Sequence, residues 1–289
     1  MLGNSNGEGL YYNAAALIRR NMSQAISIDN FLDAHQENKY VNAVGKLLIV
    51  YALLRAEKVS KLTSKDRRDQ ASYIVRQIKN TWYERLFQML TENVSASQVD
   101  VLPENVRFIT FNYDRCIEHY LRNSVQVYYE LSDRDAVKLA SSFIVLHPHG
   151  ALAPLEWQRE DGIPFGTNPD NLDIWRFIPN ISTFSEKMKD EAALKLIHYQ
   201  LEWAQQIIFL GFSFHENNMN ILRGESPELN GKSVFATVYN ESEESQRVFN
   251  RLILSLSASS TGMPLNLNPI LINKSCCDFL RDFHRPFTD

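Results

Sequence analysis

Polar side chains directly follow three short apolar runs of this sequence. The runs are residues 107–111, 143–146 and 207–210, and the polar residues after them include Asn112, His149 and Ser213. If the runs are parallel strands of one open sheet, their carboxyl ends meet at one edge, which is where such sheets bind ligands. An amide, an imidazole and a hydroxyl at that edge could orient water, accept a proton and hold a polar ligand. The pattern therefore predicts a ligand site at the carboxyl edge of a sheet.

The residues after the first run allow two interpretations. Asn112 and Asp114 lie just beyond an apolar strand, where an amide and a carboxylate could point into a crevice. Both residue types also accept hydrogen bonds from the first free N–H groups of a helix, so they could simply cap the helix that follows. From these residues alone the two interpretations stay open.

The second run is followed, three residues on, by a histidine that is suited to proton transfer. The unperturbed pKa of histidine is about 6.5, so His149 could accept a proton at neutral pH. Gly150 follows it and, having no side chain, would let a ligand or another backbone segment approach closely. A histidine at a strand end is often structural, and His147 competes for the same role.

The residues after the third and fourth runs could contact an anion and sugar hydroxyls. After the third run, Gly211 and Ser213 precede a helix whose N–H groups would face an anion such as pyrophosphate. Asn240 ends a fourth apolar run, residues 233–239, where its amide could bond ribose hydroxyls. A turn before a helix is the plainer explanation of Asn240.

Composition narrows the class of protein. The chain has 289 residues, 44% of them apolar and 22% charged, with a net charge of -4. This balance is that of a globular protein and disfavours nucleic-acid and acidic-membrane partners. Its three cysteines, Cys116, Cys276 and Cys277, provide no CxxC pair, so we predict neither a disulfide framework nor a metal. No apolar run approaches the roughly 20 residues that cross a bilayer, and a cytoplasmic location is expected.

The hydrophobic pattern predicts one α/β domain over residues 1–289. Residues 11–100 are expected to be mostly helical, and residues 104–289 form the α/β core. Predicted helices cover residues 11–21, a segment starting at Ser27, and residues 41–56, 67–90, 114–122, 218–222 and 241–256. Predicted strands cover residues 107–111, 125–129, 143–146, 207–210 and 233–239, and residues 151–180 form an irregular excursion rich in Pro and Gly. The expected fold is a Rossmann-like parallel sheet flanked by helices, with a helical N-terminal insertion.

In this order, the clusters resemble motifs of the sirtuin family. The matching segments are T-F-N-Y-D at residues 110–114, H-G at 149–150, G-F-S at 211–213 and the late Asn240. More narrowly, they are similar to prokaryotic sirtuin-like effectors of antiphage defence, in which F-N-Y-D and G-x-S are typical and a helical segment is inserted near the amino end. The resemblance spans residues 104–245, with weaker similarity at residues 27–33.

The resemblance implies that NAD is the substrate and that Asn112 and His149 are the catalytic pair. The other residues expected to contact NAD are Thr110, Tyr113, Asp114, Gly150, Gly211, Ser213 and Asn240. The implied activity is hydrolysis of NAD to nicotinamide and ADP-ribose, in linear or cyclic form. A homo-oligomer and a partner protein within a defence complex are also implied.

Two departures from the sirtuin pattern qualify these implications. Residues 151–180 contain no cysteine, whereas the deacylase branch carries a four-cysteine zinc module there, so protein deacylation ranks last. Sirtuin-like domains also open with a strand and a G-A-G-x-S loop, whereas only Met1 and Leu2 precede Gly3 here. Residues 3–9 could be the remnant of that loop, lost or cut short. The alternatives are therefore a non-catalytic module that binds NAD or ADP-ribose, and an assembly domain whose motifs are helix caps.

Overall fold

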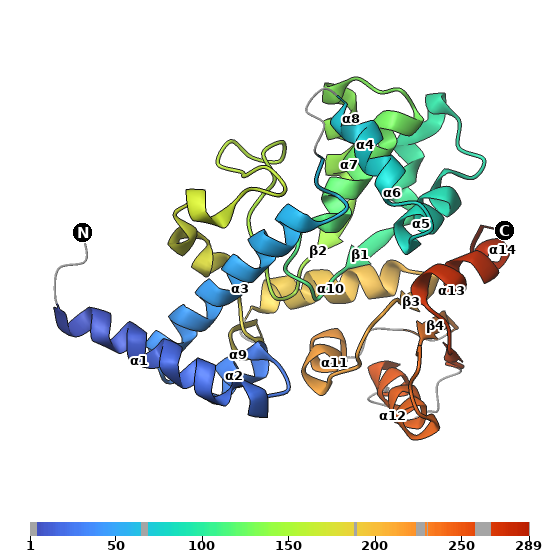
Figure 1. The fold of residues 1–289 in the computed structure, drawn as a ribbon. Helices are drawn as coiled ribbons and strands as arrows, with labels where there is room; N and C mark the ends of the chain where they lie inside the picture. Colours follow the sequence, from blue (N-terminus) through green and yellow to red (C-terminus); the bar gives the residue numbers. More distant parts are fainter. Residues whose placement is uncertain are drawn as a thin grey trace. The chain divides into compact units, whose positions relative to one another are not determined.

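The computed structural model describes residues 5–64, 69–187, 190–223, 229, 231–257 and 267–288. The chain divides into two compact units, each built from several segments. Unit 1 comprises Met1–Thr63, Asn112–Cys116 and His149–Lys189, and unit 2 comprises Ser64–Phe111, Ile117–Pro148 and Asp190–Asp289. Helices and small parallel sheets together confirm the predicted α/β class, and the N-terminal region is helical as expected (Figure 1).

Unit 1 begins with three helices joined by short turns. They are α1 (Ser5–Asn21), α2 (Ile28–Ala34) and α3 (Lys39–Val59), with a 3-10 turn, η1, at Met22–Gln24. The Ser27 hydroxyl accepts a hydrogen bond from the N–H of Asn30 at 3.1 Å, and the side chain of Asn38 caps α3 in the same way. These caps satisfy donors that a helix start leaves without a partner. The helix start predicted at Ser27 is confirmed.

The remaining part of unit 1 is the irregular excursion. It holds two 3-10 segments, η3 (Pro169–Asn171) and η4 (Ile174–Asn180), and α9 (Phe184–Lys187) follows it. A parallel bridge joins Leu155 to Ile163, and η4 packs on α3. Side chains from the N-terminal helices and from the excursion pack in one hydrophobic core. Its fully buried members include Leu32, Val41, Val50, Leu54 and Leu152. The irregular character predicted for residues 151–180 is confirmed.

The strands of unit 2 form two parallel sheets. β1 (Arg107–Ile109) pairs with β2 (Ile144–Leu146), and β3 (Gln206–Phe209), β4 (Ser233–Thr237) and β5 (Ile270–Ile272) form a second sheet in that order. In the first sheet Ile109 lies opposite Leu146, and in the second Phe209 lies opposite Ala236. The four predicted strands that end in motif residues are thus present, and β5 is an addition to the prediction.

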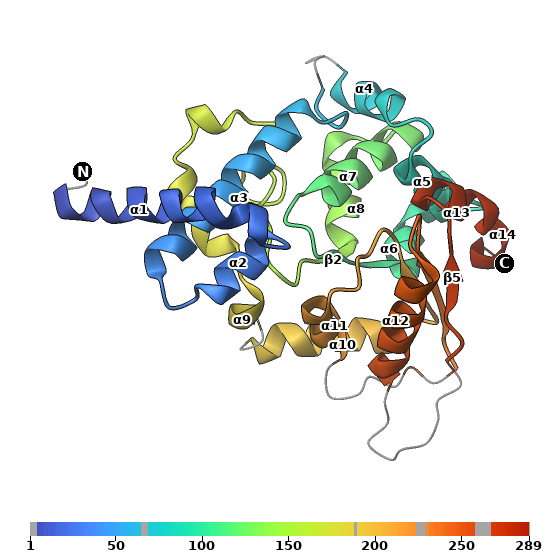
Figure 2. The same ribbon diagram turned by 60° about the horizontal axis from the view of Figure 1, so that its bottom comes forward.

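Helices make up most of unit 2 and surround these strands. They are α4 (Gln70–Gln77), α5 (Trp82–Thr91), α6 (Leu102–Asn105), α7 (Cys116–Tyr128), α8 (Asp133–Ser142), α10 (Glu191–Trp203), α11 (Glu216–Arg223), α12 (Glu243–Leu254), α13 (Cys276–Asp282) and α14 (His284–Thr288), with 3-10 segments η2 (Ala96–Val101) and η5 (Ser255–Ser257). Figure 2 shows α13 and α14 beside α5. Phe235 of β4 packs there with Phe279 and Leu280 of α13.

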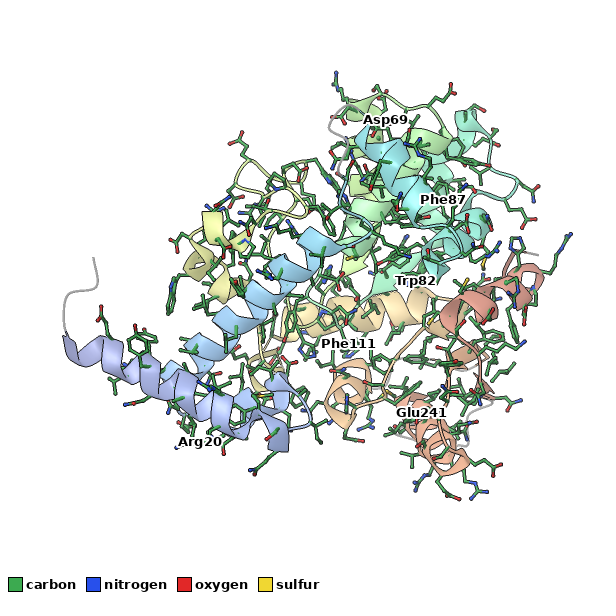
Figure 3. The ribbon with its side chains drawn as sticks, viewed as in Figure 1. Arg20, Asp69, Trp82, Phe87, Phe111 and Glu241 are labelled. Atoms are coloured by element: carbon green, nitrogen blue, oxygen red, sulfur yellow. The ribbon has the colours of Figure 1, made fainter. Side chains whose placement is uncertain are left out.

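Two predicted elements of unit 2 are wrong. Residues 125–129 are not a strand, because Val125 lies fully buried on α7 one turn after Leu121 and the helix runs on to Tyr128. The single helix predicted over residues 67–90 is two helices, α4 and α5, with Asn80 between them at a φ of 59°. Its residues 67 and 68 lie outside the described residues. Asp69, which caps α4, and Trp82, which starts α5, mark the two helix starts in Figure 3.

Candidate functional site

The paired strands β1 and β2 bring the first two motifs to one edge of a sheet. The N–H of Thr110 donates to the carbonyl oxygen of Leu146 at 2.9 Å, so the ladder continues past the end of β1. Asn112 and His149 each come three residues after the register partners Ile109 and Leu146. Because β1 and β2 are parallel, the chain leaves both strands at the same edge of the sheet, and a polar cluster follows each strand there.

Within unit 1 the two motifs contact each other. The backbone N–H of Leu152, two residues after Gly150, donates to the carbonyl oxygen of Tyr113 at 2.9 Å. The rings of Tyr113 and His149 have centroids 6.2 Å apart. Asn112 is exposed and His149 is half-buried. An exposed amide and a half-buried imidazole on adjoining segments suit the orientation and deprotonation of a small nucleophile.

The His149–Gly150 turn is fixed by the end of η4. The N–H of Ser182 donates to the carbonyl oxygen of His149 at 2.8 Å, and the side-chain amide of Asn180 donates to the carbonyl oxygen of Leu152 at 3.0 Å. Gly150 has a φ of 87°, and a Cβ there would collide with the carbonyl oxygen of Asn180. Glycine is thus required for close backbone approach, as the sequence suggested for this position, although the approaching group is the chain itself.

Tyr113 links the first motif to helix α2. Its hydroxyl donates to Oδ1 of Asp29 at 2.5 Å, and its side chain is only 8% exposed. Burial, followed by the charge of Asp29, raises the pKa of the Tyr113 hydroxyl far above its usual value. The charges of Asp33 and Glu186 act in the same direction. Tyr113 therefore remains a protonated donor at all physiological pH values.

The carboxylates around Tyr113 are held by other parts of unit 1. Oδ1 of Asp33 accepts from the hydroxyl of Ser185 at 2.9 Å and from its N–H at 3.3 Å. Glu186 pairs with the mostly buried Lys46 of α3 at 2.7 Å. These bonds attach α2 and α3 to the segment around α9, so the surroundings of Tyr113 depend on contacts between distant parts of the sequence.

A buried ion pair fixes the chain immediately after the first motif. Arg115 and Glu57 are each 1% exposed, with Nε to Oε1 at 3.0 Å. Arg115 also donates to the carbonyl oxygens of Pro154 and Ile163, at 3.3 and 2.8 Å. The guanidinium thus joins α3 to the excursion. A buried charge needs this degree of pairing, because its desolvation costs several kcal/mol.

Asp114 takes part in starting the following helix. Its Oδ1 accepts from the N–H of Cys116, the first residue of α7, at 3.0 Å. One oxygen of the Asp114 carboxylate thus acts at the helix start, as the capping interpretation predicted. A role of Asp114 in binding NAD remains a proposal.

In unit 2 the later motif residues lie at the ends of β3 and β4. Gly211 has a φ of 59°, and its N–H donates to Oγ1 of Thr237, the last residue of β4, at 2.8 Å. Asn240 also has a φ of 59°, and its N–H donates to the side chain of Asn273 at 2.9 Å. Ser213 is exposed, three residues before α11. The parallel register places these turns at the same edge of the sheet.

The predicted site residues divide between the units. Unit 1 holds Asn112, Tyr113, Asp114, His149 and Gly150, and unit 2 holds Thr110, Gly211, Ser213 and Asn240. Sequence reasoning missed Asp29, Glu57, Arg115 and Thr237, which hold the motif segments. The only signal for any of these residues was the weak similarity at residues 27–33.

The remnant of a phosphate loop predicted at residues 3–9 is wrong for residues 5–9. Residues 5–9 form the first turns of α1, and Gly3 and Asn4 lie outside the described residues. The strong helix formers of α1 lie after this stretch, at residues 14–17, and the helix extends back from them over residues 5–9. Within the described ranges, no helix is long and apolar enough to cross a membrane, and no group of three His, Cys, Asp or Glu residues could hold a metal ion.

Comparison with known families accounts for these motifs. A model of the SIR2-like domain matches residues 106–256, which is more than half of the chain and includes all three motifs and Asn240. No curated protein and no solved structure matches the chain. SIR2-like domains bind NAD, and the family consists generally of NAD-dependent enzymes. The chain belongs to the SIR2-like domain family.

Proposed function

We propose that this protein is an NAD hydrolase that releases nicotinamide and ADP-ribose. The observation that carries the proposal is the contact between the Tyr113 and His149 segments within unit 1, because it brings an exposed amide and a histidine to adjoining strand ends. Membership of a family that binds NAD supports the choice of substrate.

In the proposed reaction, the bond between C1′ of the ribose and the ring nitrogen of nicotinamide breaks. The bonding electron pair stays on that nitrogen, and C1′ gains positive charge as the bond lengthens. Water oxygen then bonds to C1′, oriented by the side-chain amide of Asn112. His149 accepts the proton that the water loses and passes it to solvent, so one proton is released for each NAD consumed.

The remaining motif residues bind and orient NAD in this proposal. Tyr113, Asp114 and Gly150 surround the nicotinamide end, with Thr110 at the end of β1. Gly211 and Ser213 hold the phosphates through the turn after β3, where N–H groups are natural anion ligands. Asn240 holds the adenosine ribose.

Water is proposed as the acceptor because the excursion offers no zinc module. Residues 151–180 contain no cysteine, and η4 within them packs against α3. We further propose that the hydrolase is an antiphage effector in the cytoplasm that depletes NAD as a homo-oligomer, together with a partner protein of a defence complex.

One observation favours a second candidate function, a non-catalytic module that binds NAD or ADP-ribose. Residues 5–9 form helix rather than a glycine loop, so among the described residues the turn after β3 is the segment proposed to hold the pyrophosphate. Such a domain would bind the nucleotide and regulate or assemble with a partner.

Product analysis with NAD separates the two functions. Purified protein is incubated with NAD, and nicotinamide, ADP-ribose and cyclic ADP-ribose are separated by chromatography. We expect release of nicotinamide that is lost in Asn112→Ala and His149→Ala and retained in His35→Ala, a matched histidine substitution elsewhere in unit 1. Binding of NAD in calorimetry without product supports the binding module. If the protein neither binds NAD nor forms product, both proposals are contradicted.

A further inference from the structure

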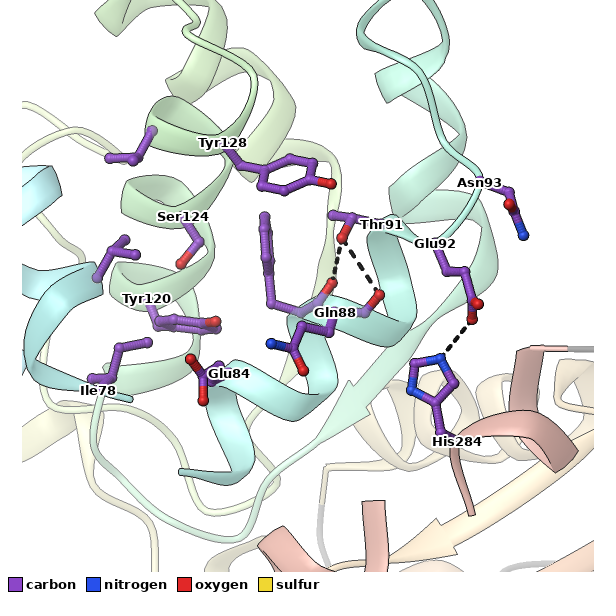
Figure 4. A pocket seen from close by; sticks show the side chains of 13 residues that line it. Ile78, Glu84, Gln88, Thr91, Glu92, Asn93, Tyr120, Ser124, Tyr128 and His284 are labelled. Carbon is purple, nitrogen blue, oxygen red and sulfur yellow. Dashed lines mark hydrogen bonds and ion pairs between the residues drawn. The ribbon is translucent and has the colours of Figure 1, made fainter. Parts of the chain in front are cut away.

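Unit 2 contains a cavity to which neither the motifs nor the proposed reaction assigns a role. It has a volume of about 550 Å³, and its walls come from α4, α5 and α7, with His284 of α14 at one side (Figure 4). This volume falls in the range of small-molecule sites, about 300 to 1,000 Å³. None of the predicted NAD-contacting residues lines the cavity.

Three aromatic rings form one wall. Phe87 of α5 meets Tyr120 and Tyr128 of α7 edge to face, with centroids 6.1 and 5.5 Å apart and interplanar angles of 79° and 83°. The hydroxyl of Tyr120 donates to the carbonyl oxygen of Tyr83 at 2.8 Å, which fixes its ring. All three line the cavity, with Phe87 and Tyr120 buried and Tyr128 58% exposed. Aromatic rings attract ammonium groups through cation–π contacts.

The charged groups at the cavity are acidic. Glu84 and Glu92 line it, and its lining includes no lysine or arginine. Glu92 is paired with His284 at 2.6 Å. Glu84 accepts the N–H of Asn80 at 2.7 Å through Oε2, and a carboxylate has capacity for further donors at its other oxygen. Burial raises the pKa of Tyr120, and the charge of nearby Glu84 raises it further. Phosphate groups would be repelled here, and cations attracted.

We propose that this cavity binds a small organic cation, a quaternary or protonated ammonium, between the Phe87, Tyr120 and Tyr128 rings and the Glu84 carboxylate. The rings supply cation–π attraction, and Glu84 supplies an ionic or charge-assisted contact to the ligand. Free NAD, with two phosphates, does not match this lining. The proposal is thus independent of the proposed hydrolase activity.

Calorimetry on the full chain tests the proposal with defined probes. The probes are choline, benzyltrimethylammonium and 3,3-dimethylbutan-1-ol, the last being choline with its charged nitrogen replaced by carbon. We expect at least one cation to bind with a Kd of about 1 mM or lower, and the neutral alcohol to bind about 10-fold or more weakly than choline. Glu84→Gln should weaken cation binding about 5-fold or more, whereas Glu104→Gln, an exposed carboxylate on α6, should leave it unchanged.

Three results would overturn the proposal. They are the absence of binding by both cations up to about 10 mM, equal binding of choline and the neutral alcohol, and cation binding that Glu84→Gln leaves intact. Phe87→Leu keeps an apolar side chain in the core and serves as a second variant if Glu84→Gln does not fold. It should also weaken the binding of the cations.

Discussion

The N–H of Leu152 donates a hydrogen bond to the carbonyl oxygen of Tyr113 at 2.9 Å, and so joins the segment after β1 to the segment after β2. The bond uses backbone atoms only. Side-chain substitutions at Asn112 and His149 can therefore remove chemistry without breaking the link that holds the two segments together. This separation of backbone geometry from side-chain chemistry makes the proposed site open to mutational tests.

Gly150→Ala should reduce both stability and activity. The position has a φ of 87°, and an added Cβ would meet the carbonyl oxygen of Asn180, so the turn must open to accept it. We expect a loss of more than about 1 kcal/mol in the free energy of unfolding, measured with urea. Gly9→Ala, at a helical position with open space around it, is the control and should be neutral or stabilising. Equal effects of the two changes would contradict the structural account of Gly150.

Tyr113→Phe should change the dependence of stability on alkaline pH. The folded-state pKa of Tyr113 is raised by burial and by Asp29, so above about pH 10 the unfolded chain releases a proton that the folded chain keeps. The contribution is complete below about pH 10 and falls by about 1.4 kcal/mol per pH unit above it. Urea unfolding at pH 9 to 11 should show a shallower decline for Tyr113→Phe. The exposed Tyr199→Phe is the control, and a wild-type slope in Tyr113→Phe would refute the prediction.

Glu57→Ala should be among the most destabilising substitutions in unit 1. It leaves the guanidinium of Arg115 buried without its carboxylate, which typically costs about 3 to 5 kcal/mol. Asp161→Ala removes the partner of Arg159 from a pair in which both side chains are well exposed, and should cost less than about 1 kcal/mol. Urea midpoints of the two variants measure the difference. Similar midpoints would mean that the Arg115 pair contributes little.

Under the proposed hydrolase function, Thr237→Val should weaken binding of NAD more than it slows turnover. The substitution keeps the shape of the side chain but removes the oxygen that accepts the Gly211 N–H, so the turn after β3 loses a constraint. We expect KM for NAD to rise about 5-fold or more, equivalent to about 1 kcal/mol, with a smaller change in kcat. Thr237→Ser retains the hydroxyl and should behave as wild type. A fall in kcat alone would show that Gly211 does not serve ground-state binding.

Local sequence patterns predicted the elements whose signals are local. β1 to β4 were found because each is a short apolar run that ends in a polar turn, and Ser27 marked a helix start by its capping side chain. The error at residues 125–129 has the same origin. Val125 and Val127 favour strands locally, but burial of Val125 on the face of α7 decides the outcome.

The residues that hold the motif segments in place could not be predicted from local sequence patterns. Tyr113 and Asp29 are 84 residues apart in sequence, and Arg115 and Glu57 are 58 apart. Pairs this far apart produce no helical or strand periodicity that a sequence pattern could reveal. Their partners become apparent only when unit 1 is assembled. The motif residues themselves were found by resemblance and by their places at strand ends, and their roles toward NAD remain proposals.

The discontinuous course of unit 1 has a consequence for protein synthesis. Lys46 and Glu186 are 140 residues apart, and the turn at His149 needs Asn180 and Ser182 for its hydrogen bonds. Because closing such long loops must precede these contacts, unit 1 is expected to be completed late. A nascent chain in which synthesis has not reached Glu186 lacks the complete set of contacts that holds the segment around His149. Ribosomes that stall before that point would thus release fragments that lack the hydrogen bonds around His149.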